Sequence, residues 1–207
     1  MSKRVYISAD YDFDSGDRNV VDELNKWGQD DKHKVDFVDM AKVVSGSVSS
    51  SSDCRPCDLK LEFNKQINAS SYVVFVIGDK TASRTSGSGC RRSGDYLSFP
   101  TCTPYKQNAN GKKFCKVMST CSAGEDFGSI NSFSYLRHEF EQAKKKGKNI
   151  IVVYNSTRHE SSWLPSYMNE YECVAEPFWI KNESGDKVGN YEFIKEALGY
   201  QWWLKRF

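Results

Sequence analysis

The sequence predicts an α/β fold, in which a parallel β-sheet of four to five strands is flanked by helices on both faces. Strand-like and helix-like segments alternate along the chain, which is the pattern that βαβ units produce. Residues 72–77 form a continuous apolar run between a serine and a glycine, as expected of a strand buried on both faces at the sheet centre. The length of 207 residues, with 39% hydrophobic and 27% charged side chains, suits one globular domain spanning 1–207.

The N-terminal part of the chain predicts a strand, a helix and a second strand. Arg4–Ser8 alternates and is rich in β-branched and aromatic residues, and polar turn-forming residues follow it. A helix is predicted from Arg18 to Gly28, a residue suited to the end of a helix. Its apolar residues fall at helical spacing and are Val20, Val21, Leu24 and Trp27. Val35–Asp39 is the second, short strand.

Two further helices are predicted from apolar residues at helical spacing. The first closes at Ser70, and its apolar positions are Leu59, Leu61, Phe63 and Ile67. The second carries Phe133, Leu136, Phe140 and Ala143 on one face. We predict that it ends at Lys144–Lys146 and Gly147, since cations are favoured at the negative end of the helix dipole.

The C-terminal part continues the alternation. Strands are predicted at Asn149–Tyr154 and Pro177–Ile180, and an amphipathic helix at Tyr191–Leu204. Two polar stretches interrupt the series, at about residues 44–57, which are rich in serine, and 84–131. Both are predicted to be insertions into the domain.

The fold class indicates where a ligand would bind, and the composition excludes several functions. Parallel sheets bind ligands at the carboxyl ends of their strands, so the loops after Ser8, Asp39 and Ile77 are the relevant ones. The net charge of +2 is too small to indicate binding to the phosphate backbone of a nucleic acid. No Walker loop, Gly-x-Ser-x-Gly or His-Glu-x-x-His motif is present. With no signal-peptide pattern and no apolar run of about 20 residues, we expect a cytoplasmic protein without membrane contact.

Six of the seven cysteines lie in or beside the two insertions. Cys54-Arg-Pro-Cys57 has the spacing of one half of a zinc site. Two of the four later cysteines would complete such a site, and our candidates are Cys90 and Cys102. A structural zinc ion would fasten a long loop that has few apolar residues. Disulfides, which a reducing cytoplasm disfavours, and unligated cysteines acting as small apolar side chains stay open as alternatives.

Three segments of the chain resemble a known family. They are the opening Val5-Tyr-Ile-Ser-Ala-Asp-Tyr-Asp12, the central strand Val73–Ile77, and Tyr135-Leu-Arg-His-Glu139 followed by Lys148-Asn-Ile-Ile-Val-Val153. The pattern resembles a TIR domain, in the TIR-like branch found in bacterial Thoeris antiphage systems. The resemblance covers residues 4–83 and 131–154. It implies a flavodoxin-like TIR fold with the cysteine-containing stretch as an insertion.

The resemblance also implies which residues form an active site. The catalytic glutamate of the family corresponds to Glu139. The residues that the resemblance assigns to NAD binding are Ser8, Ala9, Asp10, Tyr11, Asp39 and Tyr135. Tyr135 stands where the family more often has tryptophan, which keeps an aromatic wall but changes the shape of the pocket. Asp39 lies at the start of a loop that the serine-rich insertion occupies.

The activity that the resemblance implies is cleavage of NAD between nicotinamide and ribose, by an NAD glycohydrolase or ADP-ribosyl cyclase that makes a cyclic ADP-ribose-type signal. A carboxylate held against the ribose stabilises the oxocarbenium charge that develops as this bond breaks. The implied partners are NAD as substrate, a separate effector that senses the product, and a phage component as trigger. A homo-oligomer would complete the site if a loop of a neighbour positions the ligand.

Other interpretations of the same residues stay open. The rival functions are a TIR module used only for protein assembly and a nucleoside-processing transferase that uses the same glutamate. Taken alone, Glu139 is a glutamate on an amphipathic helix, where most such residues are solvated. His138 is not expected to be catalytic, because neighbours on a helix point about 100° apart. Asp10, Asp12 and Asp14 with Asp79 would suit a metal or phosphoacceptor site, although turn and capping roles are commoner.

Overall fold

A computed structural model describes residues 3–10, 16–31, 34–40, 55–84, 105–107, 113–115 and 134–200 of the chain. These residues form an α/β fold around a five-stranded parallel sheet with the strand order β2-β1-β3-β6-β7. The strands are β1 (Lys3–Ser8), β2 (Val35–Asp39), β3 (Tyr72–Ile77), β6 (Asn149–Tyr154) and β7 (Glu176–Pro177). The predicted α/β class and the central place of residues 72–77 are confirmed. The strand order is compatible with a flavodoxin-like fold.

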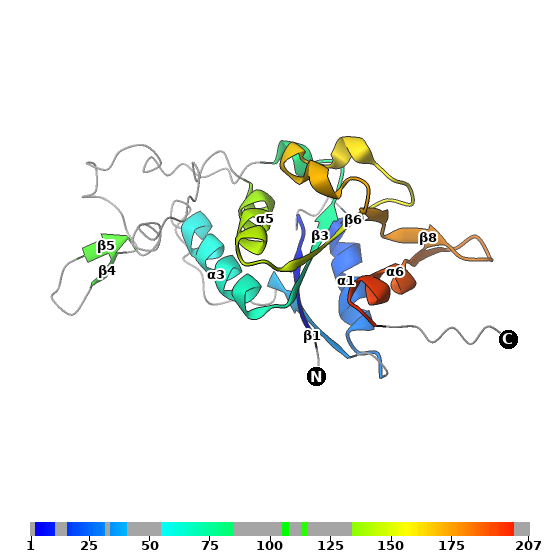
Figure 1. Ribbon diagram of the computed structural model, residues 1–207, viewed down its shortest axis with the longest axis horizontal. Helices are drawn as coiled ribbons and strands as arrows, with labels where there is room; N and C mark the ends of the chain where they lie inside the picture. Colours follow the sequence, from blue (N-terminus) through cyan, green and yellow to red (C-terminus); the bar gives the residue numbers. More distant parts are fainter. Residues whose placement is uncertain are drawn as a thin grey trace.

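Helices cover both faces of the sheet (Figure 1). One face carries α1 (Asp17–Trp27) and α6 (Tyr191–Ala197), and the other carries α3 (Arg55–Ala69) and α5 (Tyr135–Lys145). The strand order reverses between β1 and β3, because the chain goes from β1 to β2 on one side and from β3 to β6 on the other. Open α/β sheets bind ligands at such a point, beyond the carboxyl ends of the strands.

The boundaries of α1 and α5 follow from residues at their ends. At the end of α1, the Gly28 N–H donates to the Leu24 carbonyl at 3.0 Å. α5 begins after Ser134, whose hydroxyl accepts a hydrogen bond from the Arg137 N–H at 3.0 Å. It ends before Gly147, which has a φ of 60°. A serine at the N-cap and a left-handed glycine after the last turn are common helix boundaries.

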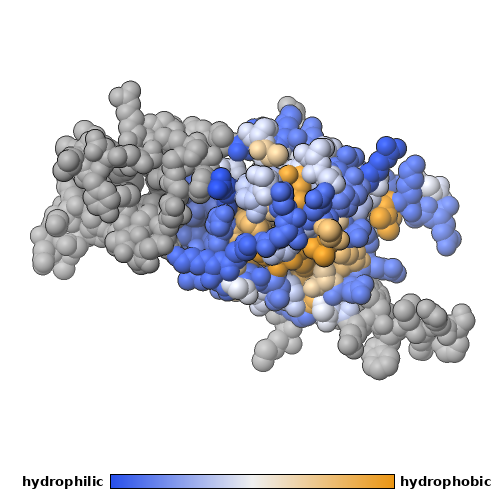
Figure 2. Space-filling view, turned by 45° about the horizontal axis from the view of Figure 1, so that its top comes forward, coloured by the Kyte–Doolittle hydropathy of each residue, from blue (hydrophilic) through white to orange (hydrophobic). Residues whose placement is uncertain are grey.

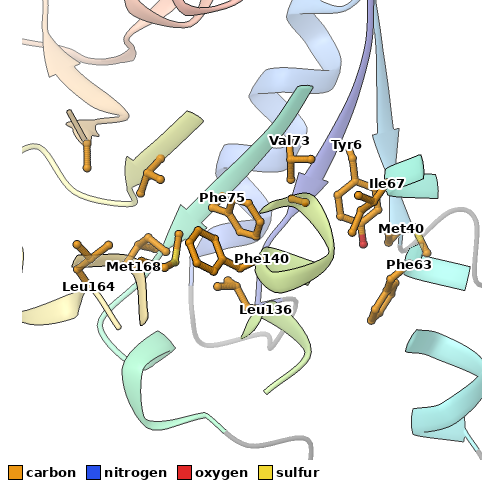
Figure 3. Packing of buried hydrophobic residues seen from close by; sticks show 14 of the residues in the cluster. Tyr6, Met40, Phe63, Ile67, Val73, Phe75, Leu136, Phe140, Leu164 and Met168 are labelled. Carbon is orange, nitrogen blue, oxygen red and sulfur yellow. The ribbon is translucent and has the colours of Figure 1, made fainter. Parts of the chain in front are cut away.

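Alternation along the strands divides the buried residues into two clusters, one on each face of the sheet. Val74 packs on the α1 side, whereas its neighbours Val73 and Phe75 pack on the side of α3 and α5. Phe75 packs against Phe140 of α5 (Figure 3), and their ring centroids lie 5.6 Å apart with the ring planes at 75°. Because burying one such side chain contributes roughly 1.5–3 kcal/mol, this contact helps to fix α5 on the sheet.

The strand predicted at Pro177–Ile180 is divided between two sheets. β7 ends at Pro177, and β8 (Trp179–Lys181) pairs antiparallel with β9 (Lys187–Gly189) in a separate hairpin. Pro177 has no N–H to donate, and the next two N–H groups donate to Tyr154 and Ser156 at 2.8 and 3.1 Å. The chain after Pro177 therefore stays bonded to the end of β6 and to a residue beyond it, and then enters the separate hairpin. A proline in an edge strand often marks such a boundary.

The terminal helix is shorter than the sequence pattern predicts. α6 ends at Ala197 instead of Leu204, and Gly199 follows with a φ of 73°. A left-handed glycine commonly follows the last turn of a helix. Residues 201–207 lie outside the described residues.

The two predicted insertions are described in part. α3 begins at Arg55, so the helix includes the end of the first stretch, which was predicted at about 44–57. In the second stretch, β4 (Tyr105–Gln107) pairs antiparallel with β5 (Lys113–Cys115). Three 3-10 helices complete the described elements, and they are η1 (Thr81–Ser83), η4 (Ser161–Trp163) and η5 (Ser166–Tyr171).

The described surface is mainly hydrophilic. On the face that Figure 2 presents, hydrophilic residues surround a smaller area of hydrophobic ones. The large hydrophobic residues exposed among the described residues are Val174 and Ile180. Within the described part of the chain, no helix combines the length and the apolar character that crossing a membrane requires.

Candidate active site

Glu139 lies at the centre of a group of polar side chains that β1 and α5 bring together. Its Oε1 accepts a hydrogen bond from the Tyr6 hydroxyl at 2.8 Å, and its Oε2 accepts one from the Ser8 hydroxyl. Tyr6 and Ser8 are two residues apart on one strand, so their side chains point to the same face of the sheet. Glu139 is more than 130 positions from both of them in the sequence, and all three side chains are buried.

The position of this group matches the ligand-binding edge of the fold. Ser8 is the last residue of β1 and pairs in register with Phe75 of β3. Glu139 therefore lies beside the carboxyl end of β1, at the point where the strand order reverses. A side chain placed there is suited to contact a ligand bound beyond the strand ends.

Burial gives the Glu139 carboxyl an unusual proton affinity. Desolvation raises its pKa to about 7, and the hydrogen bonds from Ser8 and Tyr6 offset only part of this increase. Glu139 is 5% exposed, and no cation of the described residues forms an ion pair with it. A carboxyl with a pKa near neutral exchanges its proton in the physiological range, which suits general acid–base or electrostatic roles.

Aromatic side chains lie on the helix that carries Glu139 and on the elements packed against it. Tyr135 is half-buried one turn before Glu139, and its ring makes a T-shaped contact with Phe63, with centroids 5.7 Å apart. The ring of Tyr167 in η5 lies 5.7 Å from the Phe140 ring, and the Arg137 guanidinium lies 5.3 Å from the Tyr167 centroid. Burial raises the pKa of Tyr167 to about 12, and the nearby charge of Glu139 adds to this.

His138 faces away from this group, toward α3. Its Nε2 lies 3.0 Å from Asn64 Oδ1 and 3.3 Å from the Lys60 carbonyl oxygen. Burial lowers the pKa of His138 to about 3, with a further contribution from the Lys60 charge, so the ring is neutral at physiological pH. The side chain joins α5 to α3.

Asp39 lies on the opposite face of the sheet from Glu139. It pairs in register with Ile7 of β1, whose side chain packs on the α1 side. Arg18 of α1 donates to both Asp39 carboxylate oxygens, at 3.3 and 2.9 Å, and Asn25 donates at 3.3 Å. The Asp39 side chain is only 1% exposed. The structure does not bring this carboxylate to Glu139, and contact of Asp39 with NAD stays a prediction.

The other predicted NAD-binding residues follow β1 directly. Ala9 and Asp10 are half-buried at the carboxyl end of this strand. The Asp10 carboxylate forms an ion pair with Arg84, at 2.5 Å between Oδ2 and Nε. Tyr11 lies outside the described residues, as do Asp12 and Asp14.

The predicted zinc site falls on parts of the chain whose side chains the structure does not describe. Cys54, Cys90 and Cys102 lie outside the described residues, and the side chain of Cys57 is not described. Among the described residues, no three histidine, cysteine, aspartate or glutamate side chains form a group that would hold a metal ion.

Two residues at the carboxyl edge of the sheet, Tyr6 and Asp17, were not predicted from the sequence. Tyr6 shares its strand face with Ser8, and the spacing of two residues is a signal that would have pointed to it. Asp17 is fully buried at the start of α1 and contacts Asn155, which is 138 positions away in the sequence. No local pattern indicates that contact.

Comparisons with known proteins do not assign the chain to a family. No family model, curated protein or solved structure matches it. The function must therefore be inferred from the residues around Glu139.

Proposed function

We propose that this chain cleaves NAD between nicotinamide and ribose, with Glu139 as the catalytic residue. The observation that carries the proposal is a buried carboxyl at the carboxyl end of β1, held at both oxygens by hydroxyl donors and paired with no described cation. The opening strand and the Tyr135–Glu139 segment resemble TIR-like proteins, and this resemblance is the reason for proposing NAD as the substrate.

In the proposed reaction, the bond between the ribose C1′ carbon and the nicotinamide nitrogen breaks. The electron pair of this bond goes to the pyridinium ring, so nicotinamide leaves as a neutral molecule. The ribose develops oxocarbenium character, and the ionised Glu139 stabilises that positive charge. Water attack at C1′ then gives ADP-ribose and a proton, whereas attack by a nucleophile of the same molecule gives a cyclic isomer.

Tyr6 and Ser8 have a defined part in this proposal. Their hydroxyls hold the two Glu139 oxygens in one orientation against the sheet, and preorganised groups of this kind lose little energy to reorganisation during the reaction. They also lower the pKa of Glu139 relative to burial alone. The carboxylate form, which stabilises the cation, is therefore populated at neutral pH.

The wider proposal concerns the product and its use. We propose that the product is a cyclic ADP-ribose-type messenger, that a separate effector senses it during cytoplasmic antiphage defence, and that a phage component triggers its synthesis. Exclusion of water from the site would favour the cyclic product over ADP-ribose. Assembly into a homo-oligomer is part of the same proposal.

The experiment is mass spectrometry of the products formed from NAD, in lysates of phage-infected and uninfected cells, with purified protein added. The test variant is Glu139→Gln, and the matched control is Glu141→Gln, because Glu141 is exposed on the same helix. We expect nicotinamide and a cyclic or linear ADP-ribose product from the wild type and the control, and neither from Glu139→Gln.

Two results would overturn the proposal. Turnover of a nucleoside but not of NAD, lost in Glu139→Gln, would assign the site to a nucleoside-processing transferase. Absence of turnover in both lysates, from protein shown to be folded, would favour a module used only for assembly, and Glu139→Gln would then retain its biological activity.

A further inference from the structure

Asp17 is a buried carboxyl for which the proposed reaction has no use. It is fully buried at the first residue of α1. Its Oδ1 accepts a hydrogen bond from the Asn155 side-chain nitrogen at 2.9 Å, and its Oδ2 accepts one from the Asp10 backbone N–H at 3.3 Å. Asp10 follows β1 and Asn155 follows β6. Asp17 therefore joins the connections that leave the carboxyl ends of two strands.

Two glycines leave the space that this arrangement needs. A Cβ atom on Gly78, which follows β3, would lie 2.9 Å from Asp17 Oδ1. A Cβ atom on Gly16, which has a φ of 69°, would lie 3.0 Å from the Asn155 nitrogen. Side chains at either position would displace the contact between Asp17 and Asn155. The connections after β1, β3 and β6 thus all meet at Asp17.

The orientation of the Asn155 amide is set by a further hydrogen bond. Its Oδ1 accepts from the indole N–H of Trp179 in β8 at 2.9 Å. The amide nitrogen is therefore the atom that faces Asp17. The backbone N–H of Asn155 donates to the Ile77 carbonyl at 2.8 Å, which continues the pairing of β6 with β3. Asn155 is therefore held both at its backbone and at its side-chain amide.

Asp17 occupies a position where a negative charge is costly. Desolvation raises its pKa to about 7, and the charges of Asp10 and Asp79 add to this, whereas Asn155 and the Asp10 N–H oppose it. Arg84 faces the Asp10 carboxylate. What a carboxylate offers here is two acceptor oxygens for donors on two separate connections.

We propose that Asp17 is a positioning residue that holds Asp10 and the start of the connection after β1 in the arrangement that binds the substrate. This inference rests on the proposed function, in which Asp10 is one of the NAD-binding residues. Asp17 acts through the Asp10 backbone, so its loss weakens substrate binding more than it slows bond cleavage.

The structure provides an exchange of two residues as the test. In Asp17→Asn, an amide nitrogen replaces one of the two carboxylate oxygens. This nitrogen cannot accept, so either the Asn155 side-chain nitrogen or the Asp10 N–H loses its acceptor. Asn155→Asp places two carboxylates in contact. The double variant, Asp17→Asn with Asn155→Asp, restores each hydrogen bond. The amide introduced at position 17 donates to position 155 and accepts from the Asp10 N–H, and the second oxygen at position 155 accepts from Trp179.

The first measurement is independent of substrate and follows amide hydrogen exchange at Asp10. We expect faster exchange in Asp17→Asn and wild-type protection in the double variant. Asn149→Asp is the control for Asn155→Asp, because Asn149 lies at the amino end of β6, the strand that Asn155 follows. If Asn155→Asp does not fold, Asn155→Ala replaces it, since this change also removes the donor to Asp17. Unchanged exchange at Asp10 in the folded single variants would overturn the proposal.

The second measurement is the kinetics of NAD cleavage. We expect KM to rise on the order of tenfold in the single variants with kcat within about twofold, and to return in the double variant, as for a displaced binding group. A fall in thermal stability with unchanged KM would overturn the proposal, because it would show a merely structural role. If the wild type cleaves no NAD, the proposed function fails, and the exchange data alone decide whether Asp17 positions Asp10.

Discussion

The Glu139 carboxylate receives its hydrogen bonds from two hydroxyl groups, Tyr6 and Ser8, and no described cation forms an ion pair with it. A neighbouring arginine or lysine would hold the pKa of a buried glutamate below its ordinary value. Hydroxyl donors compensate for only part of the desolvation, so the pKa stays at about 7. Each hydroxyl therefore sets how much of the carboxylate form exists at neutral pH.

Tyr6→Phe is expected to move the pH dependence of NAD cleavage toward higher pH. The change removes a donor that lowers the pKa of Glu139. One hydrogen bond contributes about 1 kcal/mol, which corresponds to a shift of roughly one pH unit or less. Because the proposed reaction uses the ionised carboxylate, kcat/KM at neutral pH falls and recovers in alkaline buffer. The measurement is the profile of kcat/KM against pH.

Tyr72→Phe is the matched control for this prediction. Tyr72 is the first residue of β3, at the amino end of the sheet, where Lys3 lies 5.3 Å from its ring centroid. Its hydroxyl is remote from Glu139, so the profile stays that of the wild type. NMR titration of the Glu139 carboxyl checks the same shift without substrate. An unchanged titration in Tyr6→Phe would contradict the assigned role of the hydrogen bond.

The sequence allowed Glu139 to be singled out, whereas the residues around it were only partly predictable. Ser8 and Tyr135 were expected beside the NAD by resemblance, and the structure shows Ser8 in contact with Glu139. Tyr6 follows from the two-residue period of a strand. Asp17 could not be predicted, because its burial depends on Asn155 and on the absence of a side chain at Gly78.

The helix α5 connects the candidate active site to the apolar core. Its apolar residues pack on the sheet, and the same helix presents Glu139 to β1. The helix begins at Ser134, whose hydroxyl caps the Arg137 N–H. Glu139 lies in the second turn, so fraying of the first turn would affect how the carboxyl is held.

Ser134→Ala is expected to destabilise the protein by about 1 kcal/mol, the usual cost of losing an N-cap. The variant leaves the Arg137 N–H without its acceptor, whereas Ser134→Asn supplies another side-chain oxygen at the same position. The measurement is urea unfolding of the two variants and the wild type. Equal stability of Ser134→Ala and Ser134→Asn would show that the cap does not stabilise α5.

The elements with strong patterns were predictable, and those set by distant contacts were not. The apolar run of β3 and the helical spacing of α1 and α5 gave boundaries within two residues of the observed ones. The division between β7 and β8 depends on N–H groups that turn toward the end of β6. The end of α6 at Ala197 depends on Gly199, whose left-handed conformation does not continue the helix.

Two buried carboxyls, those of Glu139 and Asp17, lie at the carboxyl edge of the sheet. Glu139 is held on the side of α5, and Asp17 begins α1 on the other side. Burial raises the pKa of each to about 7. The apolar clusters on both faces stabilise the fold, whereas the burial of these two carboxyls is unfavourable and falls at the edge where a ligand would bind. Functional sites often carry such local costs.

The raised pKa of Glu139 has a defined sign for stability. The folded protein binds this proton more tightly than the unfolded chain, whose glutamates titrate near 4.5. The stabilisation is fully present below that value and is lost as pH rises through about 7. A pKa difference of this size corresponds to a loss of about 3 kcal/mol as an upper limit. Asp17 titrates in the same direction and adds to the loss.

The wild type is therefore expected to lose stability between pH 5 and pH 8 relative to Glu139→Gln, whose amide does not titrate. The glutamine still accepts a hydrogen bond and offers an N–H to the second hydroxyl, so the contacts with Tyr6 and Ser8 are kept in form. Urea unfolding of both proteins across this pH range measures the difference, with Glu141→Gln as the reference for removal of an exposed charge. A free-energy difference between wild type and Glu139→Gln that does not change with pH would mean that Glu139 is already ionised at pH 5. The carboxyl would then be solvated in the folded protein, and the pH dependence proposed for cleavage would have to come from another group.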